Sequence, residues 1–267
     1  MAGGLAACVP AMRRAREPRI AAAAAFTRET ALVLSLIALW QFAGSHAFLR
    51  PQSALARGDW LWHAEQVMRM PSEAAVQHAF LPYPLIVQAC NIYYFALHFP
   101  VLMGCMIWLF LRHREKYRTA RTTLIAFTAS CLLIQLIPVA PPRMLPATGM
   151  VDTALRYGQS VYAMTPGFEP NQLSAMPSVH VGWAILAVIL VIETARSRWR
   201  WLALAHPPLT GLVVVVTANH FWLDGIVAAV LLAAVLLVQR AVTGPPRDAR
   251  PPESGAVSEK IDVGSSR

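Results

Sequence analysis

The sequence predicts an all-α, polytopic membrane protein with a bundle of six transmembrane helices, and three observations lead to this fold class. Of the 267 residues, 56% are hydrophobic and only 14% are charged, which is more apolar than a typical soluble domain. The basic residues are distributed unevenly along the chain. Six apolar stretches are about as long as a helix must be to cross a bilayer: residues 30–49, 89–111, 122–139, 179–195, 201–218 and 221–239.

The distribution of lysine and arginine sets the expected orientation. Of the 23 basic residues, 18 fall in the N-terminal segment, the loops after the second and fourth spans, and the C-terminal tail, whereas 5 fall in the remaining loops. Because basic residues are concentrated in cytoplasmic segments, we expect both termini in the cytoplasm and the protein in the cell membrane. The net charge of +9 therefore reflects membrane topology, and no nucleic-acid partner is expected.

The segments outside the spans complete the domain organisation. We expect a basic cytoplasmic segment at 1–28, a membrane domain at 29–243 and a disordered cytoplasmic tail at 244–267, which is rich in Pro, Ser and charge. Residues 140–178 should form an irregular extracytoplasmic cap. The Pro207-Pro208 pair lies inside the fifth apolar run and should kink that helix.

The first extracytoplasmic loop, residues 50–88, contains its own helical pattern. Trp60, Ala64, Val67 and Met68 recur at the spacing of one helix face. An apolar stripe of this kind, flanked by polar residues, is typical of a helix that lies in the membrane interface. We therefore expect an interfacial amphipathic helix in this loop.

Two short polar motifs mark the starts of apolar runs. Met176-Pro177-Ser178-Val179-His180 opens the fourth span, and Asn219-His220-Phe221-Trp222-Leu223-Asp224 opens the sixth. Arg143 follows the third span. The expected topology places all of these residues on the outer side of the membrane. Because ionisable groups so close to lipid are costly, their gathering at one side predicts a functional site.

The residue types in these motifs suit phosphoryl transfer. Ser178 and Asn219 are good helix N-caps, and two helix N-termini would direct amide groups and positive dipole ends toward one point. Arg143 adds a bidentate donor for phosphate. His220 and Asp224 share a helix face, so the carboxylate could accept the Nδ1 proton and leave Nε2 free to attack phosphorus. His180 would then protonate the leaving alkoxide.

Each residue also has a plainer interpretation when it is taken alone. A histidine at a helix end is often an interfacial cap, Asp224 could be a solvated helix-start residue, and Arg143 could anchor a headgroup. Two histidines and an aspartate could also bind zinc. The chain has no HExxH spacing, and an arginine would repel a cation, so we expect neither a metal nor another cofactor.

At these motifs the sequence resembles the type 2 phosphatidic acid phosphatase superfamily. Pro177-Ser178-Val179-His180, followed by Gly182, and Asn219-His220-Phe221-Trp222-Leu223-Asp224 resemble its second and third signature motifs. They are most similar to the branch that contains the inositol phosphorylceramide synthases and their bacterial relatives. The stretch Ala140-Pro141-Pro142-Arg143-Met144-Leu145-Pro146 resembles that branch's counterpart of the first motif. The resemblance runs from about residue 55 to residue 240.

The resemblance implies a six-helix bundle with an extracytoplasmic, metal-independent site. It implies His220 as nucleophile, Asp224 as its orienting residue, His180 as general acid and Arg143 as phosphate ligand. The chain also departs from the superfamily's standard pattern. Leu136 stands where the first motif has a lysine, Met144 follows Arg143 in place of proline, and Val213-Val214 replaces a Ser-Arg pair. Ser178 and Asn219 would therefore contribute to phosphate binding.

These observations lead us to expect an inositolphosphotransferase-like enzyme. It would transfer a phosphoryl or phospho-headgroup from a phosphorylated lipid to a polyol or to water through a phosphohistidine. The alternative within the enzyme class is a lipid phosphate or polyprenyl pyrophosphate phosphatase. The alternative of another class is a non-catalytic membrane protein that binds lipid, which would not require an oriented nucleophile.

Overall fold

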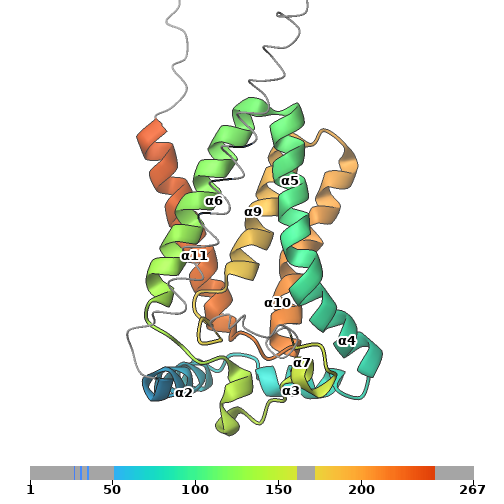
Figure 1. Ribbon diagram of the computed structural model, residues 1–267, viewed down its shortest axis with the longest axis vertical. Coiled ribbons are helices and arrows are strands. Elements are labelled where there is room, and N and C mark those ends of the chain that lie inside the picture. Colours follow the sequence, from blue (N-terminus) through green and yellow to red (C-terminus); the bar gives the residue numbers. More distant parts are fainter. Residues whose placement is uncertain (1–26, 28–30, 32–34, 36–50, 161–171, 244–267) are drawn as a thin grey trace, which may run out of the picture.

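The computed structural model describes residues 27, 31, 35, 51–160 and 172–243, and from Pro51 onward these form a helical bundle (Figure 1). Five helices, α5, α6, α9, α10 and α11, run along the long axis, and α2, α3 and α7 lie across one end. The elements are α2 (Pro51–Val67), α3 (Glu73–Phe80), α4 (Pro84–Ile92), η1 (Tyr93–Leu97), α5 (His98–Arg112), α6 (Arg114–Gln135), η2 (Pro142–Met144), η3 (Pro146–Thr148), α7 (Thr153–Arg156), α9 (Val179–Thr194), η4 (Arg198–Ala205), α10 (His206–Val216) and α11 (Trp222–Thr243).

The expected spans can be compared with these helices. Three helical stretches are long and apolar enough to cross a membrane: Pro84–Arg112, Arg198–Val216 and Trp222–Val242. Helix α9 is apolar but shorter, and α6 has 22 residues of which the first are basic and polar. The described residues therefore confirm an all-helical fold with candidate membrane spans. The count of six spans stays a prediction, because the expected span at 30–49 and the segments 1–28 and 244–267 lie outside the described residues, apart from three isolated positions.

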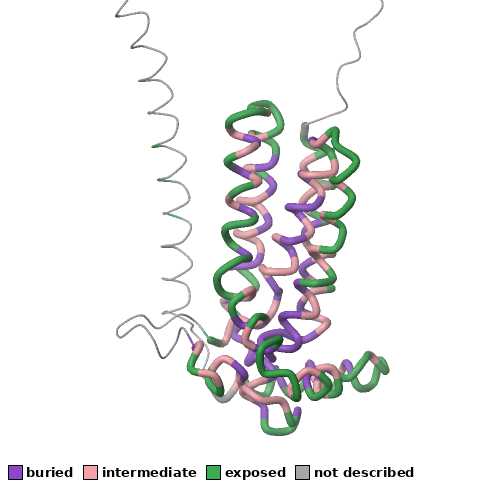
Figure 2. The backbone as a smooth tube through the Cα atoms, turned by 90° about the vertical axis from the view of Figure 1, so that its right-hand side faces the viewer, coloured by how far each residue is buried: buried purple, intermediate pink, exposed green. Residues whose placement is uncertain are grey.

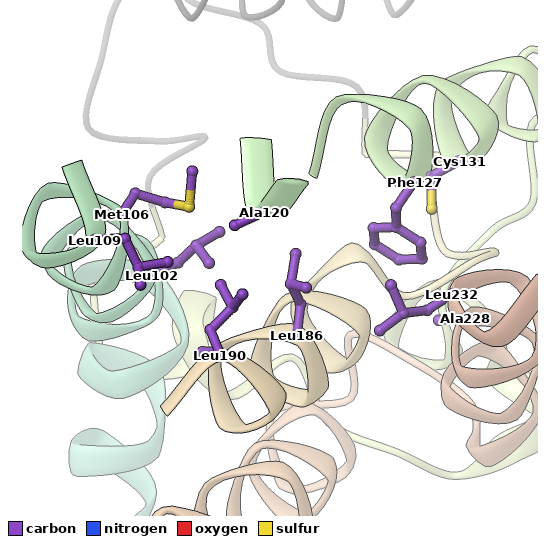
Figure 3. Packing of buried hydrophobic residues seen from close by; sticks show 11 residues of the cluster. Leu102, Met106, Leu109, Ala120, Phe127, Cys131, Leu186, Leu190, Ala228 and Leu232 are labelled. Atoms are coloured by element: carbon purple, nitrogen blue, oxygen red, sulfur yellow. The ribbon is translucent and has the colours of Figure 1, made fainter. Parts of the chain in front are cut away.

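The bundle is held together by a core of buried side chains from α5, α6, α9 and α11 (Figure 3). Phe127 of α6 belongs to this core and is fully buried. A Cβ atom placed on Gly182 of α9 would lie 2.0 Å from the Cζ atom of Phe127. Only glycine therefore allows α9 to approach α6 this closely, and that approach fixes the position of the α9 N-terminus.

Helix α2 confirms the helix expected in the loop before the second predicted span, and it has two distinct faces. Trp60 and Val67 are 69% and 80% exposed, whereas Leu61 and Glu65, on the other face, are buried. The buried face packs against the segment that carries Arg143: the backbone N–H of Ala140 donates to the carbonyl of Ala54 at 3.1 Å. Its location at a membrane interface stays a prediction.

Buried residues gather inside the bundle and where its end meets α2 and α3 (Figure 2). Pro207 and Pro208 lie in the first turn of α10, directly after the 3₁₀ segment η4, so they stand where the helical stretch Arg198–Val216 changes from 3₁₀ to α. Proline is well accommodated there, since the first amides of a helix have no intrahelical acceptor.

Candidate active site

Helices α9 and α11 begin at the end of the bundle that α2 and α3 cover (Figure 1), and the residues singled out in the sequence lie at or near these helix starts. His180 lies in the first turn of α9, and Asp224 lies in the first turn of α11. His220 lies just before α11, and its ring centroid is 5.7 Å from that of His180. Arg143, in η2, donates its backbone N–H to the carbonyl of Ala218 at 3.1 Å. The structure thus brings the predicted residues together.

The turn between α10 and α11 is short and tightly bonded. Ala218 has a φ of 53°, a left-handed backbone conformation that residues other than glycine rarely adopt. The backbone N–H of Asn219 donates to the carbonyl of Val214 at 3.0 Å, which closes the C-terminus of α10 in the manner of a Schellman motif. This buried turn fixes the backbone on which His220 is carried.

Asn219 does not have the capping role that its residue type predicts. Helix α11 begins at Trp222, three residues further on, so the side chain of Asn219 is too early in the chain to cap it. Its Nδ2 donates to Oγ1 of Thr217 at 2.8 Å, and its Oδ1 accepts a short hydrogen bond from Nη1 of Arg143. Asn219 therefore positions the guanidinium group.

The hydrogen bonds of His220 define which ring nitrogen is free. Nδ1 lies 2.7 Å from the carbonyl oxygen of Ala175 and 3.3 Å from Oδ2 of Asp224. Because a carbonyl oxygen only accepts, the geometry requires Nδ1 to carry the proton. Nε2 is then unprotonated, and it is buried with no hydrogen-bond partner among the described residues.

Asp224 consequently contributes less to the orientation of His220 than the four-residue spacing predicted. Its Oδ2 accepts a hydrogen bond from the backbone N–H of Phe221 at 2.9 Å, a shorter contact than the one to His220. The carbonyl of Ala175 makes the closest contact with the ring. Ala175 is itself held in place, because its N–H donates to the carbonyl of Val139 at 3.2 Å.

Ser178 has the capping role that was expected, at the start of α9. Its Oγ accepts from the backbone N–H of Val181 at 3.4 Å, and the side chain is fully buried. Its own N–H donates to the backbone carbonyl of Asp224 at 3.0 Å. Ser178 therefore joins the N-termini of α9 and α11 and keeps His180 beside His220.

The two helix N-termini do not offer their amides equally, which corrects the expectation of two anion-binding ends. In α11 the amides are occupied by carboxyl groups: Phe221 donates to Asp224, Trp222 to Glu73 at 3.3 Å and Leu223 to Glu65 at 2.7 Å. In α9 the amides of Val179 and His180 precede the first intrahelical bond, which runs from Gly182 to Ser178. An anion at this site would therefore accept hydrogen bonds from the first amides of α9.

Two ring side chains that the sequence motifs did not single out lie beside His180. The Tyr94 ring stacks on His180 with centroids 4.2 Å apart, and His98 lies at 4.8 Å. Tyr94 belongs to η1, a π-helical turn of the kind often found at functional sites. The available signal was the four-residue spacing of Tyr94 and His98 in an otherwise apolar segment.

A small pocket adjoins Arg143. The Nε atom of Arg143 lies 3.4 Å from Oδ2 of Asp152, and the arginine side chain is 5% exposed. The pocket is lined by Asn91, Tyr94, Phe95, Arg143, Asp152, Ala154, Gln159, Ser160 and Asn219. Most of these residues carry a hydrogen-bonding side chain, apolar atoms make up most of the exposed lining, and Tyr94 lies between the pocket and His180. The pocket has a volume of about 20 Å³ and so has room for about one water molecule beside Arg143.

Groups of three or more His, Cys, Asp or Glu side chains arranged to hold a metal ion were not found within 51–160 and 172–243. Glu65, Glu73 and Asp224 approach the start of α11, but each accepts a hydrogen bond from a backbone amide of that helix. These carboxyl groups therefore cap a helix in this structure.

A comparison with protein families identifies the class to which this chain belongs. A family model described as the PAP2 superfamily matches residues 59–238, and the chain is a member of that superfamily. No curated protein and no solved structure gave a match. Together with the candidate spans, membership makes this an integral membrane protein of the lipid phosphate phosphatase and phosphotransferase type. The match does not distinguish branches within the superfamily.

Proposed function

We propose that the protein transfers a phosphoryl or phospho-headgroup from a membrane lipid to an alcohol, with inositol or a related polyol as the favoured acceptor. One observation carries the proposal. The Nδ1 proton of His220 is directed to the carbonyl of Ala175, and Nε2 has no hydrogen-bond partner among the described residues. A histidine held in this tautomer, beside an arginine and a second histidine, is arranged as a nucleophile toward phosphorus.

In the first step, Nε2 of His220 attacks the phosphorus atom and the bond to the lipid alkoxide breaks. Arg143 and the amides at the start of α9 stabilise the charge on the phosphoryl oxygens. Ser178 holds this end of α9 in place. His180 donates its proton to the departing alkoxide, and the phosphoryl group remains on His220. Asp224 and the carbonyl of Ala175 stabilise the positive charge on the phosphorylated ring.

In the second step, the hydroxyl group of the acceptor gives its proton to His180, which the first step left neutral. The acceptor oxygen then forms a bond to phosphorus, and the bond between phosphorus and Nε2 breaks. Both histidines return to their starting protonation states. No redox chemistry is needed, and no step passes through a metal ion.

The residue types beside Arg143, and not the size of the pocket there, support an acceptor with hydroxyl groups. Asn91 donates to Oε1 of Gln159 at 2.8 Å and accepts from Oγ1 of Thr153 at 2.8 Å, so the amide groups are held in fixed orientations. Asp152, 28% exposed, offers a carboxylate to a hydroxyl. Side chains of this kind form hydrogen bonds with hydroxyl groups, and the proposal of the inositolphosphotransferase-like branch rests on the sequence motifs.

The membrane topology is part of the same proposal. The basic residues at the end of α5 and the start of α6, after α9 and at the end of α11 lie at the bundle end opposite the site. This arrangement supports six spans, cytoplasmic termini and an extracytoplasmic site.

The test is an assay of the purified protein in detergent with phosphatidic acid, with and without inositol. We expect inositol phosphate to form at the expense of inorganic phosphate when inositol is present, and His220→Ala to form neither. Release of inorganic phosphate alone, unaffected by inositol, would support the phosphatase. Binding of the lipid with neither product in the wild-type protein would support the non-catalytic alternative.

A further inference from the structure

Two buried glutamates outside the predicted site hold the start of the helix that follows the nucleophile. Glu65, on α2, is 1% exposed, and Glu73, on α3, is 3% exposed. Oε1 of Glu65 accepts from the N–H of Leu223 at 2.7 Å, and Oε1 of Glu73 accepts from the N–H of Trp222 at 3.3 Å. Both amides lie in the first turn of α11, two and three residues after His220.

Helix α3 also forms a hydrogen bond with the end of α10, which precedes the same turn. Gln77, one turn after Glu73, is fully buried. Its Nε2 donates to the carbonyl of Val216 at 3.0 Å, at the end of α10, and its Oε1 accepts from the N–H of Val151 at 2.8 Å. Glu73 and Gln77 therefore clamp the end of α10 and the start of α11. Asn219 and His220 lie between these two attachment points.

The two carboxyl groups are held at neighbouring positions. Glu65 accepts from the N–H of Leu223 and Glu73 from the adjacent N–H of Trp222, Oε2 of Glu65 is buried with no hydrogen-bond partner among the described residues, and Asp224, which is fully buried, lies on the same turn of α11. Burial and the neighbouring acids raise the pKa of Glu65 to about 9. The other ionisable side chains on α2 and α3 are Arg57, Asp59, His63 and His78. On the adjoining turns lie His220 and Arg143, and Arg143 is engaged with Asp152 and Asn219. A proton held between the glutamates removes the repulsion between two buried carboxylates.

We propose that Glu65 and Glu73 are positioning residues that share one proton and hold the α10–α11 turn, so that His220 keeps its geometry toward the phosphate. This role rests on the proposed function and extends it. The pair contacts no reacting atom and acts through the backbone of α11. Loss of the shared proton would place two buried negative charges side by side and loosen the turn that carries the nucleophile.

The kinetic test compares Glu65→Ala, Glu73→Ala and Glu65→Gln with the wild type. Either alanine variant removes one anchor of α11, and we expect kcat at pH 7 to fall about 100-fold, the scale of a misplaced reacting group. Glu65→Gln keeps an acceptor for Leu223 and a permanent donor to Glu73, so its loss should be far smaller. Glu115→Gln, at an exposed glutamate at the start of α6, is the matched control and should match the wild type.

The pH profile separates shared-proton positioning from simple packing. Beyond the alkaline limb that deprotonation of His180 produces, wild-type kcat should show a further fall above a pH of about 9, where Glu65 loses its proton, and Glu65→Gln should lack this second fall. Glu115→Gln should retain it. An alkaline fall that is the same in Glu65→Gln and in the wild type would overturn the proposal.

Thermal unfolding in detergent tests the pair independently of any activity. The folded chain keeps a proton on Glu65 that the unfolded chain releases above the ordinary pKa of 4.5, so the contribution of Glu65 to stability is fully present below pH 4.5 and is lost as the pH rises toward about 9. The decrease in Tm between pH 5 and pH 9 should be smaller in Glu65→Gln than in the wild type or in Glu115→Gln. Equal decreases in Tm for all three proteins would overturn the proposal that Glu65 and Glu73 share a proton. This result would count even if no lipid tested is a substrate.

Discussion

The carbonyl oxygen of Ala175 lies 2.7 Å from Nδ1 of His220, closer than either carboxylate oxygen of Asp224. A backbone carbonyl has no proton to give, so this contact sets the tautomer of the nucleophile regardless of the state of Asp224. The carboxylate makes a shorter bond to the N–H of Phe221. Two acceptors, the carbonyl of Ala175 and the carboxylate of Asp224, therefore orient the ring, whereas one aspartate orients the histidine in a serine-protease triad.

The first prediction concerns Asp224→Asn. An asparagine can still accept from Phe221, and Ala175 still fixes the His220 tautomer, so kcat should fall by about 100-fold instead of the roughly 10,000-fold seen when a triad aspartate becomes asparagine. Steady-state kinetics with a lipid phosphate measures the loss. Asp59→Asn, at an exposed position of α2, is the control. A loss of about 10,000-fold in a stable Asp224→Asn variant would mean that the carboxylate alone orients the ring.

The second prediction concerns the contact that places α9. A methyl group on Gly182 would lie 2.0 Å from Cζ of Phe127, so Gly182→Ala should destabilise the protein by about 1–3 kcal/mol. Gly104→Ala is the matched control, because a Cβ at Gly104 of α5 meets no atom within 4 Å. It should be neutral or stabilising by up to about 1 kcal/mol. Thermal unfolding in detergent distinguishes them.

A second substitution checks the cause of that destabilisation. Adding Phe127→Leu to Gly182→Ala removes the ring atoms that the new methyl group would meet. The combined change should therefore cost less than the sum of the two single changes, since residues in contact do not behave additively. Strict additivity would show that the Gly182 methyl group is accommodated without displacing Phe127.

The sequence predicts that four side chains meet, because this depends only on the positions of the apolar runs and on the alternation of the loops. The four are His180, Arg143, His220 and Asp224. Each residue stands at the end of an apolar run, and the alternation of loops decides which ends lie on the same side. That reasoning needs no side-chain contacts. It located the site but assigned Asn219 to a helix cap, because residue type alone does not reveal that α11 begins at Trp222.

Four residues that shape the site could not be predicted in the same way: Glu65, Glu73, Tyr94 and Ala175. Glu65 and Glu73 cap α11 only because α2 and α3 fold across the bundle end, a tertiary contact between segments about 150 residues apart in the chain. Tyr94 reaches His180 through a π-helical turn, which shifts the helical register. A backbone carbonyl such as that of Ala175 leaves no signal in residue type.

The third prediction concerns topology. Basic residues concentrated at the bundle end away from the site should keep that end, and both termini, in the cytoplasm. A reporter that is active only in the cytoplasm, fused after Arg267, should be active, and the same reporter inserted after Gly149 should not. Gly149 lies in the loop at the site end of the bundle. An exported C-terminus would contradict the six-span arrangement.

The fourth prediction concerns metal ions. The proposed mechanism stabilises phosphoryl oxygens with Arg143 and with the amides at the start of α9, so turnover should be unchanged after dialysis against EDTA. The measurement is the rate of product formation before and after chelation and again after zinc is restored. Loss with EDTA and recovery with zinc would favour the zinc site that two histidines and an aspartate could also form.

The last prediction separates the roles of the two histidines, whose rings lie 5.7 Å apart. His220 must be neutral to attack, whereas His180 must be protonated to assist the leaving group. Opposed requirements of this kind produce a bell-shaped dependence of kcat/KM on pH. His220→Ala removes the covalent step, so it should abolish both turnover and the acid-labile phosphoenzyme.

The leaving group provides the discriminating measurement. A lipid alkoxide needs a proton to depart, whereas p-nitrophenolate does not, so His180→Ala should lose about 100-fold or more with a lipid phosphate and much less with a p-nitrophenyl phosphoester. Asp59→Asn again controls for purification and detergent. Equal losses of activity in His180→Ala on both substrates would show that His180 is not the general acid. Trapped phosphate in His220→Ala would show that another residue is the nucleophile.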